Sequence, residues 1–237
     1  MAIFLKGDIH GDLSAVVNFI ERMNLGENDS IIILGDFGLL WEYNRKREKE
    51  FIEFYEKNYK CNIYFIRGNH ENYNLLNKIP IENDLGKVSE HISYLLDGKV
   101  YILDGISFLI MGGADSVDKY RRIEGLNWWK EEAVSAESVQ NAITNNYCRH
   151  IDFVLTHTAP KSIVEEYKPL LCTLDLDETK LDRTSENLLD VLKEKIDFDY
   201  WCFGHFHQDV QLNDKFFCFM NDFKDIQQII QKKDYYW

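Results

Sequence analysis

Five short apolar segments of this chain end abruptly in turns that contain aspartate, asparagine or histidine. Four of these turns also contain glycine: Lys6-Gly7-Asp8-Ile9-His10-Gly11-Asp12, Leu34-Gly35-Asp36-Phe37-Gly38, Arg67-Gly68-Asn69-His70-Glu71 and Phe203-Gly204-His205-Phe206-His207. The fifth, Leu155-Thr156-His157-Thr158, has none. Because the carboxyl ends of neighbouring strands meet at one edge of a sheet, this pattern predicts that the polar side chains gather there.

The residue types in these turns are those that bind metal ions in proteins. Carboxylates combined with imidazoles suit Mn, Fe, Zn and similar ions better than Ca. Alternation along a strand predicts that Asp8 and His10 share one side of their segment, and that His205 and His207 do the same. A glycine beside such a residue lets the backbone approach an ion closely, since it has no Cβ.

The distribution of the seven histidines supports one shared site. Five of them stand at the ends of predicted strands: His10, His70, His157, His205 and His207. Separate structural roles for all five would require a coincidence, whereas one metal site explains them together. The other two, His91 and His150, have polar neighbours in the sequence, and we expect them at the surface.

Short β-branched or aromatic segments alternate with helical patterns along the chain. We predict strands at residues 2–6, 30–34, 62–67, 107–111, 151–156 and 200–203. A helix capped by Asp12 follows the first strand, a charged helix spans residues 45–57, and Thr184 is expected to cap a third helix. Residues 94–111 are predicted to form three consecutive antiparallel strands, and residues 209–219 a hairpin. Crossovers combined with hairpins indicate an α/β fold with sheets of mixed direction covered by helices.

The sequence contains no linker and no internal repeat, so we predict that residues 1–237 form a single domain. The acidic segment 174–182 is weakly patterned, and we expect a solvated loop there rather than a lid.

The net charge of −13 restricts the partners of the protein. Duplex nucleic acid is bound by Lys and Arg that displace counterions, so extended nucleic-acid binding is not expected. The first residues turn polar too early for a signal peptide, and the apolar runs are shorter than the ~20 residues of a membrane span. Five cysteines without a CxxC pair favour reduced core thiols in a cytoplasmic protein.

Taken in order, the motifs resemble those of calcineurin-like metallophosphoesterases. They are Asp8-x-His10, Gly35-Asp36, Gly68-Asn69-His70-Glu71, His157 and Gly204-His205-x-His207, and they span most of the chain. The resemblance implies a four-layer α/β/β/α sandwich with two mixed β-sheets and a dinuclear metal site at their edge.

The resemblance also implies a role for each residue of the motifs. One ion would be held by Asp8, His10 and His207, and the other by Asn69, His157 and His205. Asp36 would bridge the two ions. His70 would contact the substrate instead of a metal, and Glu71 would support the site or start a helix.

The implied mechanism is hydrolysis of a phosphate ester. Two divalent ions about 3.5–4 Å apart would share a water, lower its pKa and hold the bridging hydroxide in line with phosphorus. We expect Mn²⁺, with Fe, Zn, Ni or Mg as alternatives. His70 is the natural general acid for the leaving alkoxide. Arg67 is expected either to contact the phosphate or to be a structural ion-pair partner.

The second motif departs from that of the protein serine/threonine phosphatases of this superfamily. Those proteins carry Gly-Asp-x-Val-Asp-Arg-Gly, whereas this chain reads Gly35-Asp36-Phe37-Gly38-Leu39-Leu40-Trp41 and lacks the phosphate-binding arginine. The segment 112–122 follows a predicted strand and offers Lys119, Arg121 and Arg122 instead. We expect one of these cations to hold the substrate phosphate, with ion pairs to surface carboxylates as the equal alternative.

The substrate is therefore expected to be a phosphomonoester or a small phosphodiester, in the form of a phosphorylated small molecule, a nucleotide or a phosphoprotein. The motifs do not separate these, and the sequence leaves the oligomeric state open. The rival interpretation is a catalytically inactive scaffold that keeps the fold for protein binding. Such a protein would be expected to lose ligands or the acid histidine, and none is lost here. A structural zinc site is disfavoured because the set is rich in oxygen donors.

Overall fold

Apolar segments that are buried on both faces form the centres of two sheets in the computed structural model, which describes residues 1–42, 44–172 and 178–231. The first sheet has the strand order β13-β1-β2-β3-β6-β5-β4. Its parallel centre consists of β1 (Ile3–Lys6), β2 (Ser30–Ile33), β3 (Asn62–Phe65) and β6 (Ile92–Leu95). The edge strands β13 (Lys224–Asp225), β5 (Leu85–Lys87) and β4 (Ile81–Glu82) pair antiparallel with their neighbours.

The second sheet repeats this plan in the order β11-β12-β10-β9-β8-β7. Its parallel centre consists of β8 (Ile106–Met111), β9 (His150–Thr156), β10 (Asp197–Phe203) and β12 (Phe216–Cys218). The edge strands β7 (Val100–Leu103) and β11 (Val210–Gln211) are antiparallel. Both sheets are therefore of mixed direction, and the predicted hairpin near the end of the chain is confirmed.

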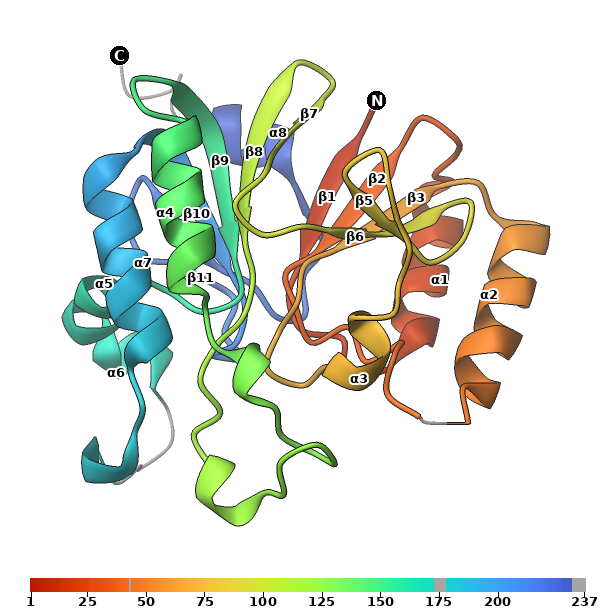
Figure 1. Ribbon diagram of the computed structural model, residues 1–237. Helices are drawn as coiled ribbons and strands as arrows, with labels where there is room; N and C mark the ends of the chain where they lie inside the picture. The colour runs from red at the N-terminus through yellow and green to blue at the C-terminus, as the bar shows by residue number, and fades with distance from the viewer. Residues whose placement is uncertain (43, 173–177, 232–237) are drawn as a thin grey trace.

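Helices cover the outer face of each sheet (Figure 1). The first sheet is covered by α1 (Leu13–Met23) and α2 (Lys46–Asn58), and the second by α4 (Ala136–Asn145), α5 (Lys161–Glu166), α6 (Lys168–Leu171) and α7 (Thr184–Lys195). Shorter elements are α3 (Tyr73–Leu76), α8 (Ile226–Ile230) and the 3₁₀ helices η1 (Lys119–Arg121), η2 (Lys130–Glu132) and η3 (Glu178–Lys180). None of the helices in the described ranges is long and apolar enough to cross a membrane.

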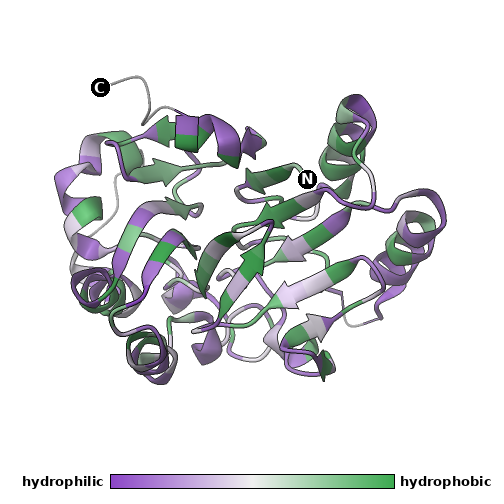
Figure 2. Cartoon of the chain, turned by 90° about the horizontal axis from the view of Figure 1, so that it is seen from above, coloured by the Kyte–Doolittle hydropathy of each residue, from purple (hydrophilic) through white to green (hydrophobic). Residues whose placement is uncertain are grey.

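Three apolar clusters separate the four layers. Phe4, Ile31 and Ile33 pack outward against the helices of the first sheet, whereas Leu5 and Ile32 point inward to the second sheet. This is the alternation of a strand whose two faces are both covered, so its sequence is a continuous apolar run. Figure 2 shows the hydrophobic colour concentrated in the central strands. The α/β/β/α sandwich with two mixed sheets is thus confirmed.

The cluster between the sheets draws on both halves of the chain, from Ile3 to Ile229. This supports our interpretation of residues 1–237 as one domain, which stays a prediction. All five cysteines are free, and Cys61, Cys202 and Cys218 are buried.

Two local predictions are wrong. Residues 92–95 and 100–103 do not pair with each other: β6 belongs to the first sheet and β7 to the second. The turn at Asp97 therefore carries the chain from one sheet to the other. Thr184 does not cap α7, since it is the first residue of that helix and donates its backbone NH and hydroxyl to Asp182 Oδ1.

Two other sequence expectations have mixed outcomes. Asp12 precedes α1 as predicted but makes no side-chain capping bond, because its Oδ1 accepts the hydroxyl of Ser14. Of the acidic segment 174–182, residues 174–177 lie outside the described residues, and η3 follows them.

Candidate metal centre

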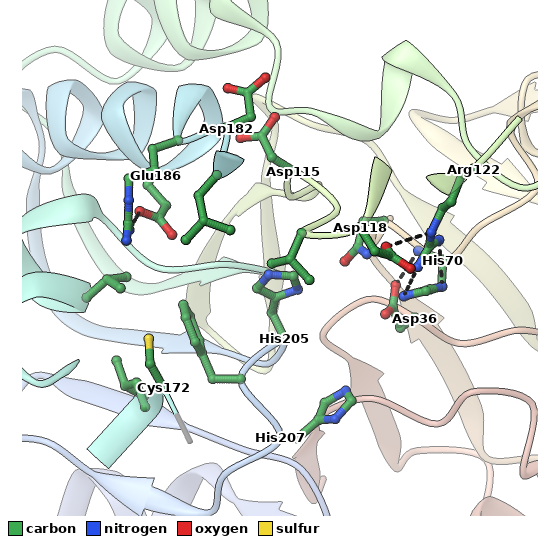
Figure 3. A pocket seen from close by; sticks show the side chains of 17 residues that line it. Asp36, His70, Asp115, Asp118, Arg122, Cys172, Asp182, Glu186, His205 and His207 are labelled. Atoms are coloured by element: carbon green, nitrogen blue, oxygen red, sulfur yellow. Dashed lines mark hydrogen bonds and ion pairs between the residues drawn. The ribbon is translucent and has the colours of Figure 1, made fainter. Parts of the chain in front are cut away.

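The seven residues predicted as metal ligands all follow the carboxyl end of a strand. Asp8 and His10 follow β1, Asp36 follows β2 and Asn69 follows β3; from the second sheet, His157 follows β9, and His205 and His207 follow β10. Contacts between these turns bring the seven side chains together where the edges of the two sheets meet. Figure 3 shows part of this group beside a cavity.

Asp8, His10 and His207 form the first group of donor atoms, which all lie within 4.8 Å of one another. Asp8 Oδ2 is 3.5 Å from His10 Nε2 and 3.0 Å from His207 Nε2. The two Nε2 atoms are themselves 3.0 Å apart. Two ligands that bind one ion at ~2.1 Å and at right angles are separated by about 3 Å, so this group fits a transition-metal ion.

Asp36, Asn69 and His157 form the second group, and an oxygen of Asp8 lies within 4.8 Å of the donor atoms of Asp36 and His157 as well. His157 Nε2 lies 3.0 Å from Asn69 Oδ1 and 3.4 Å from Asp36 Oδ1. The His205 ring lies next to that of His157, with their centroids 5.0 Å apart. Within the part of the chain that the structure describes, His205 belongs to neither close group of donor atoms, although it lines the same cavity as Asp36.

Asp36 lies between the two groups. Its Oδ2 is 3.9 Å from Nδ1 of His10, in the first group, and its Oδ1 faces His157, in the second. One carboxylate therefore has an oxygen directed to each group, which is the placement that a bridging ligand requires.

Neighbouring groups fix the orientation of the donors. His157 Nδ1 lies 2.7 Å from the carbonyl of Leu34; because a carbonyl only accepts, Nδ1 carries the hydrogen and Nε2 faces the centre. Asn69 donates its amide nitrogen to Ser116 Oγ at 3.1 Å, which leaves its Oδ1 toward the centre. The backbone NH of His205 donates to Asp8 Oδ1 at 2.9 Å.

Four of these residues have left-handed backbone conformations. The φ angles are 47° at His10, 51° at Asp36, 66° at His205 and 55° at His207. Strand alternation therefore does not place these side chains as predicted, since the residues lie in turns and not in extended strands. Such φ values are rare for residues with a side chain and cost about 1–3 kcal/mol each, and they concentrate at functional sites.

Two glycines make room for the carboxylates. A Cβ on Gly68 would lie 2.0 Å from Asp36 Oδ1, and a Cβ on Gly204 would lie 2.4 Å from Asp8 Oδ1. Gly68 thus accommodates a ligand from the neighbouring strand β2, and Gly204 accommodates one from β1 in the other sheet, and not only their own sequence neighbours as expected.

The centre holds negative charge that a cation would neutralise. Burial alone would raise the pKa of Asp36, but the charge and hydrogen bond of His157 outweigh it and hold the pKa at about 2. Burial likewise opposes ionisation of Asp8, yet hydrogen bonds from His10 and His207 hold its pKa well below the usual range. Burial would lower the pKa of His157, but Asp36 and Asp8 raise it to about 9.

His205 is in the form that binds a metal. Burial, followed by the charge of His157, lowers the pKa of His205 to about 3, so its imidazole is neutral. Neutral imidazole, ionised carboxylate and an oriented amide oxygen are the donors that a divalent transition metal requires.

His70 lies beside the centre and is covered by Arg122. The backbone NH of His70 donates to Asp36 Oδ1 at 2.7 Å. Two guanidinium nitrogens of Arg122 lie 3.3 Å from the two ring nitrogens of His70, as the dashed lines in Figure 3 mark. Burial lowers the pKa of the His70 ring, Asp36 opposes this, and Arg122 adds to the lowering.

Of the four cations predicted to hold phosphate, Arg122 alone lines the cavity at the centre in the described residues. Arg67 is buried, forms an ion pair with Asp97 and donates to the carbonyl of Ala133 at 3.0 Å. These contacts favour the structural alternative over a contact with phosphate. Lys119 forms an ion pair with Asp182. Arg121 lies over the ring of Tyr120.

The sequence did not predict the role of Ser116, which accepts the hydrogen bond that orients Asn69, and it left the role of Glu71 open. Glu71 Oε1 accepts the NH of Phe37 at 2.9 Å and so holds the turn that carries Asp36. Burial, and then the charge of Asp36, raise the pKa of Glu71 to about 8. It does not start a helix, since α3 begins at Tyr73.

The prediction for the two remaining histidines is half right. His150 is exposed, with Nδ1 2.8 Å from Asp197 Oδ2. His91 is buried against α2, where its Nδ1 lies 2.5 Å from Glu56 Oε2.

Comparison with known protein families gives one match. The family model described as calcineurin-like phosphoesterase matches residues 1–209, a range that contains His70 and every residue of the two donor groups. No curated protein matches the chain.

Proposed function

Because the chain belongs to the calcineurin-like phosphoesterase family, we propose that it hydrolyses a phosphate ester with two divalent metal ions bound where the two sheets meet. The observation that carries this proposal is the position of Asp36, with one oxygen directed to each of two groups of donor atoms.

The proposed ligands are the two groups of donors together with His205, whose ring lies next to that of His157. Asp8, His10 and His207 would hold one ion, Asn69, His157 and His205 the other, and Asp36 both. When bound, two such cations lower the pKa of a water held between them and neutralise charge on the phosphate. The mixture of imidazole, carboxylate and amide donors supports Mn²⁺, with Fe, Zn, Ni or Mg as alternatives.

The chain's own side chains would handle the substrate. Arg122 stands beside His70 at the cavity wall, where its guanidinium would hold the phosphate oxygens. His70 would protonate the leaving oxygen, which requires the charged imidazole; the negative charge of a bound phosphate favours that form.

The inactive-scaffold alternative is not favoured, because the proposed ligands and His70 lie together and are oriented by hydrogen bonds. The substrates that fit are phosphorylated small molecules, nucleotides or phosphoproteins. The net charge of −13 supports small substrates over extended nucleic acid. The free buried thiols support a cytoplasmic location.

Stripping the protein with a chelator and adding back Mn²⁺ tests the function directly. Aryl phosphates, aryl phosphodiesters, nucleotides and phosphopeptides are assayed with the metal-free and the metal-loaded protein. We expect hydrolysis of at least one class that disappears with the metal and returns with it. Tight binding of metal with no turnover in any class would support the inactive scaffold instead.

We expect His70→Asn to lower kcat about 10²–10³-fold while the metal content per chain stays the same, because the variant loses only the proton donor. The loss should be larger for alkyl phosphates than for nitrophenyl phosphate, whose leaving group needs no proton. An equal loss for both leaving groups, or a loss of metal, would contradict the acid role.

We expect Arg122→Gln to raise KM and lower kcat/KM about tenfold to a hundredfold, because a charge-assisted contact with phosphate is lost. Arg121→Gln is the matched control, since Arg121 has the same chemistry but does not line the cavity. If the two variants had the same KM and kcat/KM, Arg122 would not be a substrate-binding residue.

A further inference from the structure

Two cavities adjoin the candidate metal centre, and His70 lines both of them. The first, which we call the α7 cavity, has a volume of about 280 Å³ and is lined by Asp36, His70, His205 and His207 at its inner end. The second, the α2 cavity, has a volume of about 180 Å³ and is lined by His10 and His70. A phosphate bound at the centre would therefore have space on two sides.

The α7 cavity is apolar between the centre and its far end. The described residues that line it include Val117, Val164, Leu171, Leu181 and Phe206, which are apolar. The charged groups at its far end, of which Figure 3 labels Asp115, Asp182 and Glu186, already have partners within the protein. Arg183 Nη1 lies 2.6 Å from Glu186 Oε2, and Asp115 accepts the NH of Ser185 at 2.7 Å. This cavity consequently suits an apolar substituent.

The α2 cavity has a different chemistry. Trp41 lines it with a ring that is partly exposed, at 38%, and packs edge-on against Trp129 at a centroid distance of 6.2 Å. Arg47 and Glu42 line the same cavity. One NH group of the Arg47 guanidinium donates to the carbonyl of Gly11, and the guanidinium carries further NH donors. Glu42 offers an acceptor.

An indole ring combined with a donor and an acceptor is the set of groups that recognises a nucleobase. Bases stack on aromatic side chains and hydrogen-bond through their edges. An aliphatic or phenyl group would pack on the indole but would form no hydrogen bond with Arg47 or Glu42. The α2 cavity therefore fits a heteroaromatic, nucleoside-type substituent.

We propose that the substrate is a small phosphodiester with two unlike substituents, an apolar one in the α7 cavity and a nucleoside-type one in the α2 cavity. This inference rests on the proposed phosphoesterase function. A monoester would occupy one cavity at most, whereas a diester fills both. Water adds to phosphorus, the bond from phosphorus to the apolar alcohol's oxygen breaks, and that oxygen takes a proton, giving a nucleoside monophosphate and an alcohol.

Three substrates with the same leaving group test this inference. They are p-nitrophenyl phosphate, phenyl p-nitrophenyl phosphate and thymidine 5′-(p-nitrophenyl phosphate), assayed with the full chain loaded with Mn²⁺. We expect the highest kcat/KM for the thymidine diester. Trp41→Ala and Arg47→Gln should each lower the ratio of kcat/KM for the thymidine diester to that for the phenyl diester by about tenfold.

Lys46→Gln is the matched control, since Lys46 is the preceding exposed cation of α2, pairs with Glu50 and does not line the cavity. Its ratio should equal that of the wild type. A wild-type ratio in both Trp41→Ala and Arg47→Gln overturns the inference. So does an equal fall in kcat for all three substrates in Arg47→Gln, which would mean that Arg47 only holds the Gly11 turn. Failure to hydrolyse any phosphate ester would instead overturn the proposed function itself.

Discussion

Replacing Asp36 by Asn is expected to lower kcat/KM about 10⁴-fold, equivalent to ~5.5 kcal/mol of transition-state stabilisation. Asp36 has one oxygen directed to each group of donors. The amide of the introduced asparagine is neutral and its nitrogen is a poor metal ligand. Residue 36 would therefore present no donor atom to one of the two groups. We therefore expect the loss of at least one of the two ions, and with it the activated water and the charge compensation for the phosphate.

Metal analysis of the dialysed protein checks this expectation alongside the kinetics, with at most one ion per chain predicted for Asp36→Asn. Asp84→Asn serves as the control, because the side chain of Asp84 forms an exposed ion pair with Lys99 and such pairs contribute little. Two tightly bound ions in Asp36→Asn, together with activity near that of the wild type, would show that Asp36 is not the bridging ligand.

The centre of each sheet could be predicted from local sequence because a strand covered on both faces has no polar alternation. The run Ile31-Ile32-Ile33 shows this, with its residues buried alternately against helices and against the other sheet. The change of sheet after β6 could not be predicted from local sequence. Asp97-Gly98 satisfies the local rules for a hairpin turn, but Asp97 instead pairs with Arg67 and accepts the NH of Gly112. The path of the chain is determined by contacts of Asp97 with residues 30 and 15 positions away in the sequence.

The residue types of the candidate centre were predictable, whereas the conformation that brings them together was not. Asp8 and His10 do lie close together, but a left-handed φ at His10 produces this and not strand alternation. Such a φ is set by tertiary contacts, which no local pattern of side chains records. Arg67 and Lys119 illustrate the same limit, since a cation near a motif has the same sequence signature whether it binds phosphate or a carboxylate of the protein.

Gly68→Ala is expected to lower kcat/KM nearly as much as Asp36→Asn, although it removes no functional group. The added Cβ would lie 2.0 Å from Asp36 Oδ1 and 2.4 Å from the backbone nitrogen of Asp36. Since both are far inside van der Waals contact, the turn that carries Asp36 must move. The φ angle of Gly68 is not positive, so alanine adopts its backbone angles without strain. The effect therefore comes from the displaced carboxylate alone, and excess Mn²⁺ should restore part of the activity.

Two matched substitutions separate this explanation from a general loss of stability. Gly204→Ala places a Cβ 2.4 Å from Asp8 Oδ1 and should likewise release metal, because Asp8 belongs to the first donor group. Gly26→Ala meets no atom within 4 Å and should keep full activity, with stability unchanged or raised by about 0.4–1 kcal/mol through the unfolded chain. If all three variants kept both ions and normal turnover, close approach to these glycines would not be what positions the carboxylates.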